Sequence, residues 1–164
     1  MRILACLTVL SFAVPVAHAT DAVTVTFVDA AHYRDAAFNR EGDADPAVLT
    51  GIEKHLQSLG HRYLPAEQKL SVQVLDIDLA GRLEPWHAAN PDIRYLRDIT
   101  WPRIKLRYTL EQEGRVLGEA DETIADMNYL FRGSSYFSTD RLRYEKQMLD
   151  DWFRARFAEH RAQR

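Results

Sequence analysis

The sequence predicts an α+β fold: a mixed four-stranded sheet with two helices packed on one of its faces. Four segments alternate apolar and polar residues, which is the period of a half-buried strand, and two segments repeat apolar residues at helical spacing. They occur in the order strand, helix, strand, strand, strand, helix. With 164 residues, the chain is long enough for one domain with a substantial core and too short for two.

The first strand is expected over residues 23–29, where apolar residues alternate with threonines. Asp45 and Pro46 then begin a helix, because aspartate accepts a hydrogen bond at the N-cap and proline presets the first helical φ angle. This helix is expected to end near Gly60. Gly51, inside it, lowers helix propensity, and the sequence offers no reason for it.

The second strand is expected over residues 70–79. Its apolar residues change phase near Leu75, which indicates a bulge or burial of both faces. The third strand covers residues 104–111, and Glu113-Gly114 forms the hairpin turn into a fourth strand over residues 115–125.

The last helix is expected to begin at Ser138, which would act as its cap. Its apolar residues recur at helical spacing and predict one buried stripe. The members of this stripe are Leu142, Leu149, Trp152, Phe153 and Phe157.

Strand direction places three connections at one edge of the sheet. A strand-helix-strand crossover makes the first two strands parallel, and consecutive pairing makes the later strands antiparallel. Loops 30–44, 80–102 and 126–138 then leave the sheet at the same edge. We call the surface formed by loops 80–102 and 126–138 the aromatic edge. It holds Trp86, Tyr95, Trp101, Tyr129, Phe131, Tyr136 and Phe137.

Residues 1–19 are expected to be a cleaved signal peptide, which leaves a single domain over residues 20–164 in the periplasm. Arg2 precedes an apolar run that ends in Ala17-His18-Ala19, the small-x-small pattern at which signal peptidase cuts. A lipid anchor on Cys6 is the less favoured alternative, because only five residues precede it.

Composition narrows the classes of partner. Cys6 is the only cysteine, so the expected mature domain has no disulfide and no thiolate metal site. Loss of Arg2 takes the net charge from −3 to −4, which disfavours binding to nucleic acid. No later segment has the roughly 20 apolar residues of a transmembrane helix.

The aromatic edge supplies the candidate binding residues. Large aromatic rings suit the anchoring of a partner, and arginine binds anionic groups through two parallel hydrogen bonds. The alternative is structural: the rings pin the loops to the body, and the arginines pair with nearby acids. The candidates are Trp86, Arg94, Arg97, Trp101, Arg103, Tyr129 and Tyr136.

Three carboxylates form the other candidate site. Asp76 and Asp78 point to the same side of a strand and Glu84 follows, so together they suit a hard cation or the acid/base pair of a hydrolase. The alternative is that they cap turns or pair with arginine. The chain has no HExxH, GxSxG, SxxK or phosphate-binding glycine motif, and no cofactor is expected.

Five segments are similar to those of a known family: DIDLAG at 76–81, EPW at 84–86, RDITWPR at 97–103, YEK at 144–146 and MLDDW at 148–152. Over nearly all of residues 23–158 the chain resembles the exported bacterial proteins grouped as domain of unknown function 3016. The resemblance implies export and a single domain. It implies no activity, cofactor or catalytic residue.

The leading hypothesis is a binding or protein-interaction module that uses the aromatic edge, with another envelope protein as the candidate partner. The first alternative is a metal-dependent or acid/base envelope hydrolase that uses Asp76, Asp78 and Glu84. The second is a structural or stress-related protein without a small ligand.

Overall fold

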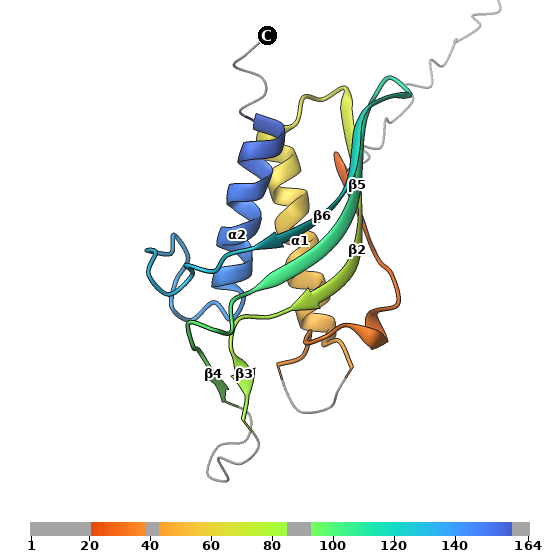
Figure 1. Cartoon of the computed structure of the whole chain (residues 1–164). Helices are drawn as coiled ribbons and strands as arrows, with labels where there is room; N and C mark the ends of the chain where they lie inside the picture. Colours follow the sequence, from red (N-terminus) through yellow and green to blue (C-terminus); the bar gives the residue numbers. More distant parts are fainter. Residues whose placement is uncertain (1–20, 39–42, 85–92, 159–164) are drawn as a thin grey trace, which may run out of the picture.

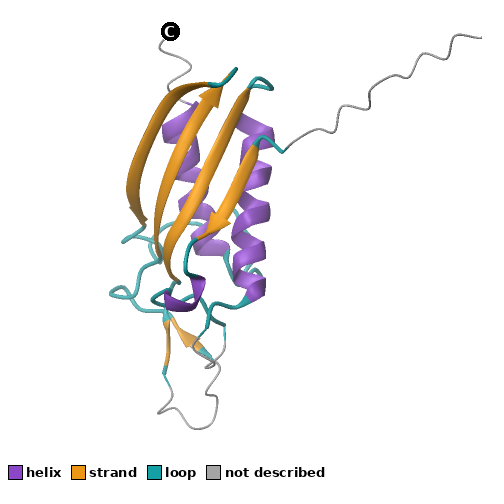
Figure 2. Cartoon of the chain, turned by 90° about the vertical axis from the view of Figure 1, so that its right-hand side faces the viewer, coloured by secondary structure: helices purple, strands orange, loops and turns teal. Residues whose placement is uncertain are grey.

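The computed structural model describes residues 21–38, 43–84 and 93–158, and these form the predicted α+β architecture. Figure 1 shows a curved sheet beside two helices, and Figure 2 shows that both helices lie on the same face of that sheet. The main sheet contains β1 (Val23–Phe27), β2 (Gln68–Asp78), β5 (Arg103–Gln112) and β6 (Arg115–Ala125), in that spatial order. The helices are α1 (Pro46–Tyr63) and α2 (Arg143–Phe153), and a separate two-stranded ribbon contains β3 (Arg82–Leu83) and β4 (Arg94–Tyr95).

Strand directions agree with the crossover prediction. β1 is parallel to β2, β2 is antiparallel to β5, and β5 is antiparallel to β6. The segments that follow β1, β2 and β6 therefore leave the sheet at one edge, the lower end in Figure 1. Glu113 and Gly114 connect β5 to β6 with φ angles of 52° and 78°, as a two-residue type I′ turn requires.

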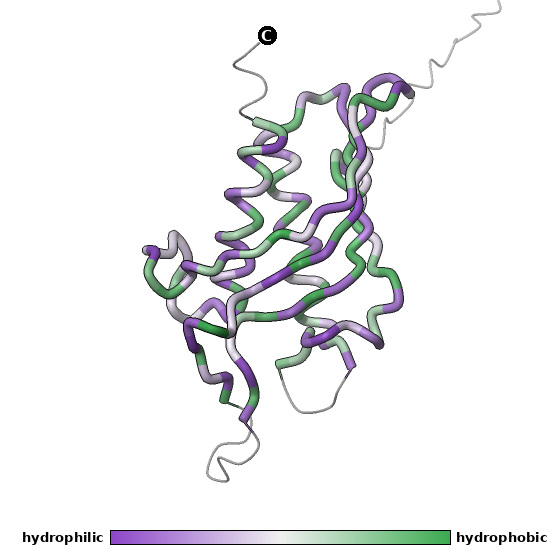
Figure 3. Tube along the Cα trace, in the orientation of Figure 1, coloured by the Kyte–Doolittle hydropathy of each residue, from purple (hydrophilic) through white to green (hydrophobic). Residues whose placement is uncertain are grey.

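The change of phase in β2 is a β-bulge. Its register against β5 shifts between Val74 and Asp76, so Leu75 is the extra residue. Apolar and polar residues alternate on both sides of the bulge (Figure 3), and Ile77 and Leu79 remain buried beyond it. The bulge thus keeps apolar side chains toward the helices up to the very end of the strand.

The core lies between the sheet and the helices. The predicted stripe of α2 is buried there, and Phe157, one turn beyond the helix, packs edge-on against Tyr108 and Trp152 at centroid distances of 5.3 and 5.4 Å. The buried residues of α1 are Val48, Ile52, Leu56, Leu59 and Gly60. None of the helices in the described ranges combines the length and apolar character needed to cross a bilayer.

Two predicted boundaries are wrong at the start of the chain. β1 ends at Phe27 and does not reach residue 29, because Asp29 adopts a left-handed conformation and leads into a short 3-10 turn. α1 continues past Gly60 to Tyr63 and stops where Leu64 becomes extended before Pro65, since proline disfavours helical geometry in the preceding residue.

The predicted cap of the last helix is also wrong. α2 begins at Arg143, and Ser138 lies outside it. Asp140 organises the intervening turn instead: its carboxylate accepts from the Leu142 amide at 2.9 Å and from Lys146 Nζ at 2.6 Å. The acidic side chain satisfies the turn before the helix and leaves the first turn of α2 without a side-chain cap.

The structure explains Gly51 and Gly60 as points of close approach. A Cβ atom on Gly51 would lie 2.5 Å from Leu142 Cδ1, and one on Gly60 would lie 2.2 Å from Val23 Cγ2. α1 therefore touches the segment before α2 at one point and the start of β1 at another.

Substituting Gly60 tests this contact. Glycine to alanine at an ordinary helix position stabilises by up to about 1 kcal/mol. We expect Gly60→Ala to lower the free energy of unfolding by about 1–3 kcal/mol, because the new methyl group overlaps the fully buried Val23. Urea denaturation measures the change. Gly118→Ala, where a Cβ meets no atom within 4 Å, is the control and should stay within about 0.5 kcal/mol of wild type. A Gly60→Ala protein as stable as wild type would contradict the close contact.

Candidate functional site

The aromatic edge is organised around the guanidinium group of Arg94 on β4, which is 12% exposed. Its nitrogens donate to both carboxylate oxygens of Asp35 and to the carbonyls of Ala37, Ala80 and Gly81, over distances of 2.8 to 3.1 Å. These bonds use all five N–H groups of an arginine. Arg94 thus fastens the loop after β1 to the end of β2 and to the ribbon.

The turn between β2 and β3 depends on Gly81. Its φ angle is +78°, and a Cβ atom there would lie 2.7 Å from the carbonyl oxygen of Tyr95. The Gly81 amide donates to the carbonyl of Thr100 at 2.9 Å, which ties this turn to the end of loop 80–102. Only glycine combines this backbone conformation with this close approach.

Asp78 forms a second ionic cluster at the end of β2. The carboxylate is buried, and the side chains of Arg34, Arg82 and Arg103 surround it. Arg82 Nη1 lies 2.7 Å from Asp78 Oδ1 and 3.1 Å from Asp35 Oδ2. This arginine therefore joins the Asp78 cluster to the ion pair between Arg94 and Asp35. A buried carboxylate with cationic partners is electrostatically satisfied without a metal ion.

The other two predicted metal ligands also contact neighbouring groups. Glu84 is buried and lies 2.7 Å from Arg97 Nη2, and Asp76 accepts a 2.8 Å hydrogen bond from the Arg34 amide. Within residues 21–38, 43–84 and 93–158, no three His, Cys, Asp or Glu side chains form a group that could hold a metal ion.

The predicted binding arginines are paired inside the molecule. Arg94, Arg97 and Arg103 pair with Asp35, Glu84 and Asp78, respectively. These are internal ion pairs, as in the structural alternative given above, although none of these acids lies next to its arginine in the chain.

Two of the predicted binding residues, Tyr129 and Tyr136, hold the loops in place. Tyr129 is buried, and its hydroxyl donates to the carbonyl of Arg97 at 2.7 Å, which joins loop 126–138 to loop 80–102. The Tyr136 hydroxyl donates to Asp150 on α2 at 2.7 Å. Trp101 is half-buried, with a guanidinium group 5.7 Å from its ring centre. Trp86 lies outside the described residues.

The exposed apolar side chains of the aromatic edge are not among the candidate binding residues predicted from the sequence. Phe137, Phe131, Ile99 and Met127 are 86%, 79%, 72% and 63% exposed, and they have the four highest values among the large apolar residues that the structure describes. The distinguishing signal was chemical: a tyrosine hydroxyl can bond to the body of the protein, whereas phenylalanine, isoleucine and methionine have no such group.

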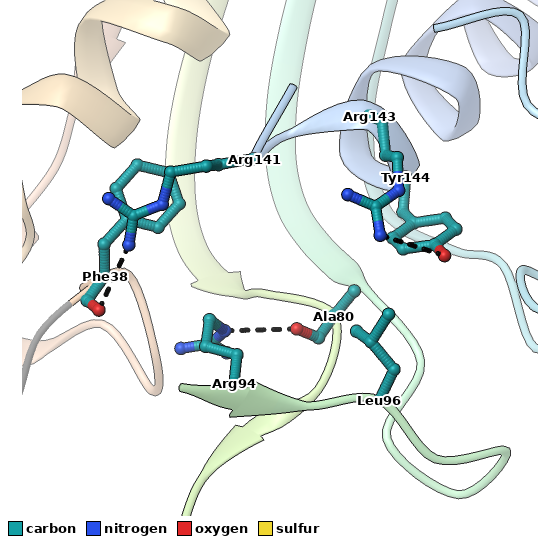
Figure 4. A pocket seen from close by; sticks show the side chains of 7 residues that line it. All are labelled: Phe38, Ala80, Arg94, Leu96, Arg141, Arg143 and Tyr144. Carbon is teal, nitrogen blue, oxygen red and sulfur yellow. Dashed lines mark hydrogen bonds between the residues drawn. The ribbon is translucent and has the colours of Figure 1, made fainter. Parts of the chain in front are cut away.

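A pocket opens beside the aromatic edge, at the start of α2 (Figure 4). It has a volume of about 180 Å³, and its walls come from three distant parts of the chain. The residues that line it are Phe38, Ala80, Arg94, Leu96, Arg141, Arg143 and Tyr144. Sequence reasoning missed Arg141 and Arg143. Their signal was two cationic residues at a helix start, where the helix dipole favours anions.

A buried acid, Glu145, lies next to this pocket. Its Oε1 atom accepts a 2.7 Å hydrogen bond from the amide of Ala80, which lines the pocket. No described atom hydrogen-bonds to its other oxygen, Oε2. Burial raises the pKa of the Glu145 carboxyl above its usual range, which favours the uncharged acid over the carboxylate.

A histidine network joins the two helices to loop 126–138. His55 Nε2 on α1 lies 2.9 Å from Asp150 Oδ1 and 3.2 Å from the carbonyl oxygen of Lys146, so this nitrogen carries a proton and donates it. Tyr136 donates to the other oxygen of Asp150. Burial lowers the pKa of His55 below 6.5, although Asp150 acts in the opposite direction.

A family model described as a protein of unknown function (DUF3016) matches residues 21–155. The chain belongs to this family. The match confirms the resemblance noted in the sequence and covers all six strands of the described chain together with α1 and α2. No curated protein and no solved structure matches the chain.

Removing Arg94 should destabilise the DUF3016 fold. Arg94→Leu leaves Asp35 without its main partner and three carbonyl groups without their donor, so we expect the free energy of unfolding to fall by about 3 kcal/mol or more. Urea denaturation measures the loss. Arg107→Leu, which breaks an exposed pair with Asp121, is the control and should lose far less stability, because solvent screens exposed ion pairs. Equal losses in the two variants would show that the Arg94 bonds are dispensable.

His55 should make stability depend on pH. Its pKa is lower in the folded protein than in the unfolded chain, so unfolding takes up a proton below pH 6.5. Stability therefore falls as the pH decreases from 6.5, by at most about 1.4 kcal/mol per pH unit from this one group. We expect His55→Gln to have a flatter profile there in urea titrations at several pH values. His32, whose pKa is raised by Asp29, acts in the opposite sense in both proteins. Identical slopes would exclude His55 as the responsible group.

Proposed function

We propose that this protein is exported to the periplasm and binds a partner protein of the cell envelope through the aromatic edge. The observation that carries the proposal is the position of the exposed apolar side chains. The four most exposed large apolar residues of the described chain, Phe137, Phe131, Ile99 and Met127, all lie on loops 80–102 and 126–138. Exposed apolar surface of this kind marks sites of interaction in soluble proteins.

These side chains are presented on a fixed support. The Tyr129 hydroxyl joins the two loops through the carbonyl of Arg97, and the Asp126 amide joins them again through the carbonyl of Pro102 at 3.3 Å. Tyr136 and Arg132 tie loop 126–138 to α2 through Asp150 and Asp151. A surface held in place before binding loses less conformational freedom on association, which favours affinity.

The expected signal peptide supports the location. Residues 1–19 combine Arg2, an apolar run and Ala17-His18-Ala19. The first residue of β1, Val23, is fully buried and lies a few residues beyond the expected cleavage point, so cleavage there leaves β1 intact. The hydrolase alternative lacks comparable support, because Asp78 and Glu84 are neutralised by arginines.

Photo-crosslinking in living cells tests this function. A photoreactive residue in place of Phe137, which is 86% exposed, should give a discrete adduct with another protein. The same residue in place of Val116, an exposed apolar position at the opposite end of the sheet, is the matched control and should give none. Lys54 on the exposed side of α1 is a second control.

A substitution then separates binding from folding. Phe131→Ser, introduced into the protein that carries the photoreactive residue at position 137, should weaken the adduct. It should leave the melting temperature nearly unchanged, because substitutions of exposed side chains usually alter stability by no more than about 0.5 kcal/mol. The absence of any adduct from position 137, or equal adducts from positions 116 and 137, would contradict a binding role for the aromatic edge.

A further inference from the structure

Arg141 and Arg143 differ from the other arginines at this end of the molecule in the groups that they contact. Arg94, Arg97 and Arg103 each pair with a carboxylate. Among the residues that the structure describes, no carboxylate forms a salt bridge with Arg141 or Arg143. In a chain with a net charge of −3, one pocket thus contains two cationic groups that have no carboxylate salt-bridge partner among the described residues.

Both guanidinium groups are held by uncharged neighbours. Arg141 lies 3.6 Å from the centre of the Phe38 ring and donates to the Phe38 carbonyl at 3.3 Å. Arg143 donates to the carbonyls of Ser138 and Asp140 at 3.0 and 3.3 Å, and lies over the ring of Tyr144. These contacts fix the positions of the cations without neutralising their charge, since carbonyl groups and rings carry no net charge.

Hydrogen-bond donors remain for a ligand. Arg141 uses one of its five N–H groups on the described residues, and Arg143 uses three. The third bond of Arg143 ends on the Tyr144 hydroxyl at 3.3 Å, which leaves the proton of that hydroxyl to donate. The pocket walls therefore offer donors from two arginines and one tyrosine, as recognition of an oxyanion requires.

The surroundings strengthen the preference for an anion. Arg143 is the first residue of α2, whose first turn has no side-chain cap, so the positive end of the helix dipole lies at the same place. Glu145, a buried acid beside the pocket, opposes an anion less because burial raises its pKa, although Arg94 and Arg143 act in the opposite direction. Arg94 adds no free donor, because protein atoms accept all of its hydrogen bonds.

The size of the pocket limits what enters it. Sites that enclose a whole drug-sized ligand have volumes of roughly 300–1,000 Å³. This pocket, at about 180 Å³, holds one functional group, with Phe38 and Leu96 as apolar walls beside it. Figure 4 shows Arg141 with Phe38 on one side of the space, Arg143 with Tyr144 on the other, and Arg94 with Ala80 below them.

We propose that the pocket between Phe38, Leu96 and the start of α2 binds a single oxyanion, a carboxylate or a phosphate group, through Arg141, Arg143 and the Tyr144 hydroxyl. The inference is independent of the partner bound by the aromatic edge, because the donors of the pocket are not among the exposed apolar side chains proposed to bind that partner. A protein without an envelope partner can still bind the anion, and the reverse also holds.

Thermal melting of the purified protein tests the site with two probes, inorganic phosphate and succinate, against sodium chloride at equal ionic strength. We expect at least one probe to raise the melting temperature in a saturable way that chloride does not reproduce. Saturation by phosphate alone identifies a phosphate site, and saturation by succinate alone identifies a carboxylate site. A melting temperature that neither probe raises with saturation overturns the proposal.

Arg141→Gln is the decisive variant, because its side chain is exposed and its loss should not disturb the fold. It should weaken the apparent affinity for the active probe by about tenfold or more, the factor that one charge-assisted hydrogen bond contributes. Arg141→Lys keeps the charge without the paired donors and should fall in between. Arg115→Gln, at the far end of β6, makes the same change in charge and should bind like wild type. Equal affinities in Arg141→Gln and Arg115→Gln would overturn the assignment.

Discussion

The bonds from Arg94 to Asp35 and to three carbonyl groups are the contact on which the loops at this end of the protein depend. The loop after β1 and the end of β2 bury apolar side chains such as Phe38 and Ile77, and Arg94 adds hydrogen bonds that join them to the ribbon β3–β4. One guanidinium group supplies donors to all three. A buried arginine is suited to this task, because its five donors lie in one plane and its charge is balanced by one carboxylate. The sheet supports the loops, and the bonds from Arg94 fix the positions of these loops relative to the sheet.

The arginines of this end thus fall into two groups with different consequences. Those that pair with carboxylates, such as Arg97 with Glu84, hold segments together. Such a pair has no net charge and therefore attracts a charged ligand only weakly. Those that meet carbonyl groups and aromatic rings, Arg141 and Arg143, are equally well positioned but keep their charge. The aromatic residues divide in the same way: tyrosines whose hydroxyls bond to the body anchor the loops, and phenylalanines without that option remain at the surface.

Local sequence chemistry was enough to predict the sheet and the helices. Alternation in β2 and β5, the Asp45-Pro46 helix start and the Glu113-Gly114 turn are each encoded within a few neighbouring residues, and the crossover rule then gave the parallel pair β1 and β2. The site was harder to predict, because its partners are remote in sequence: Arg94 and Asp35 are 59 positions apart, and Arg141 meets Phe38 across 103. Ser138 failed as a cap because Asp140, two residues later, competes successfully for the same turn.

The pocket at the start of α2 has a consequence for how the molecule can be recognised. Its walls are contributed by Phe38 after β1, by Ala80 and Leu96 on either side of the ribbon, and by Arg141, Arg143 and Tyr144 before and within α2. These segments meet only when the parallel strand pair, the ribbon and the last helix are all in place. A group that fits there has no counterpart site in a partly folded chain, so its binding energy adds entirely to the completed structure. Such a ligand would serve as a selective label for finished molecules, distinguishing them from chains still in the process of folding.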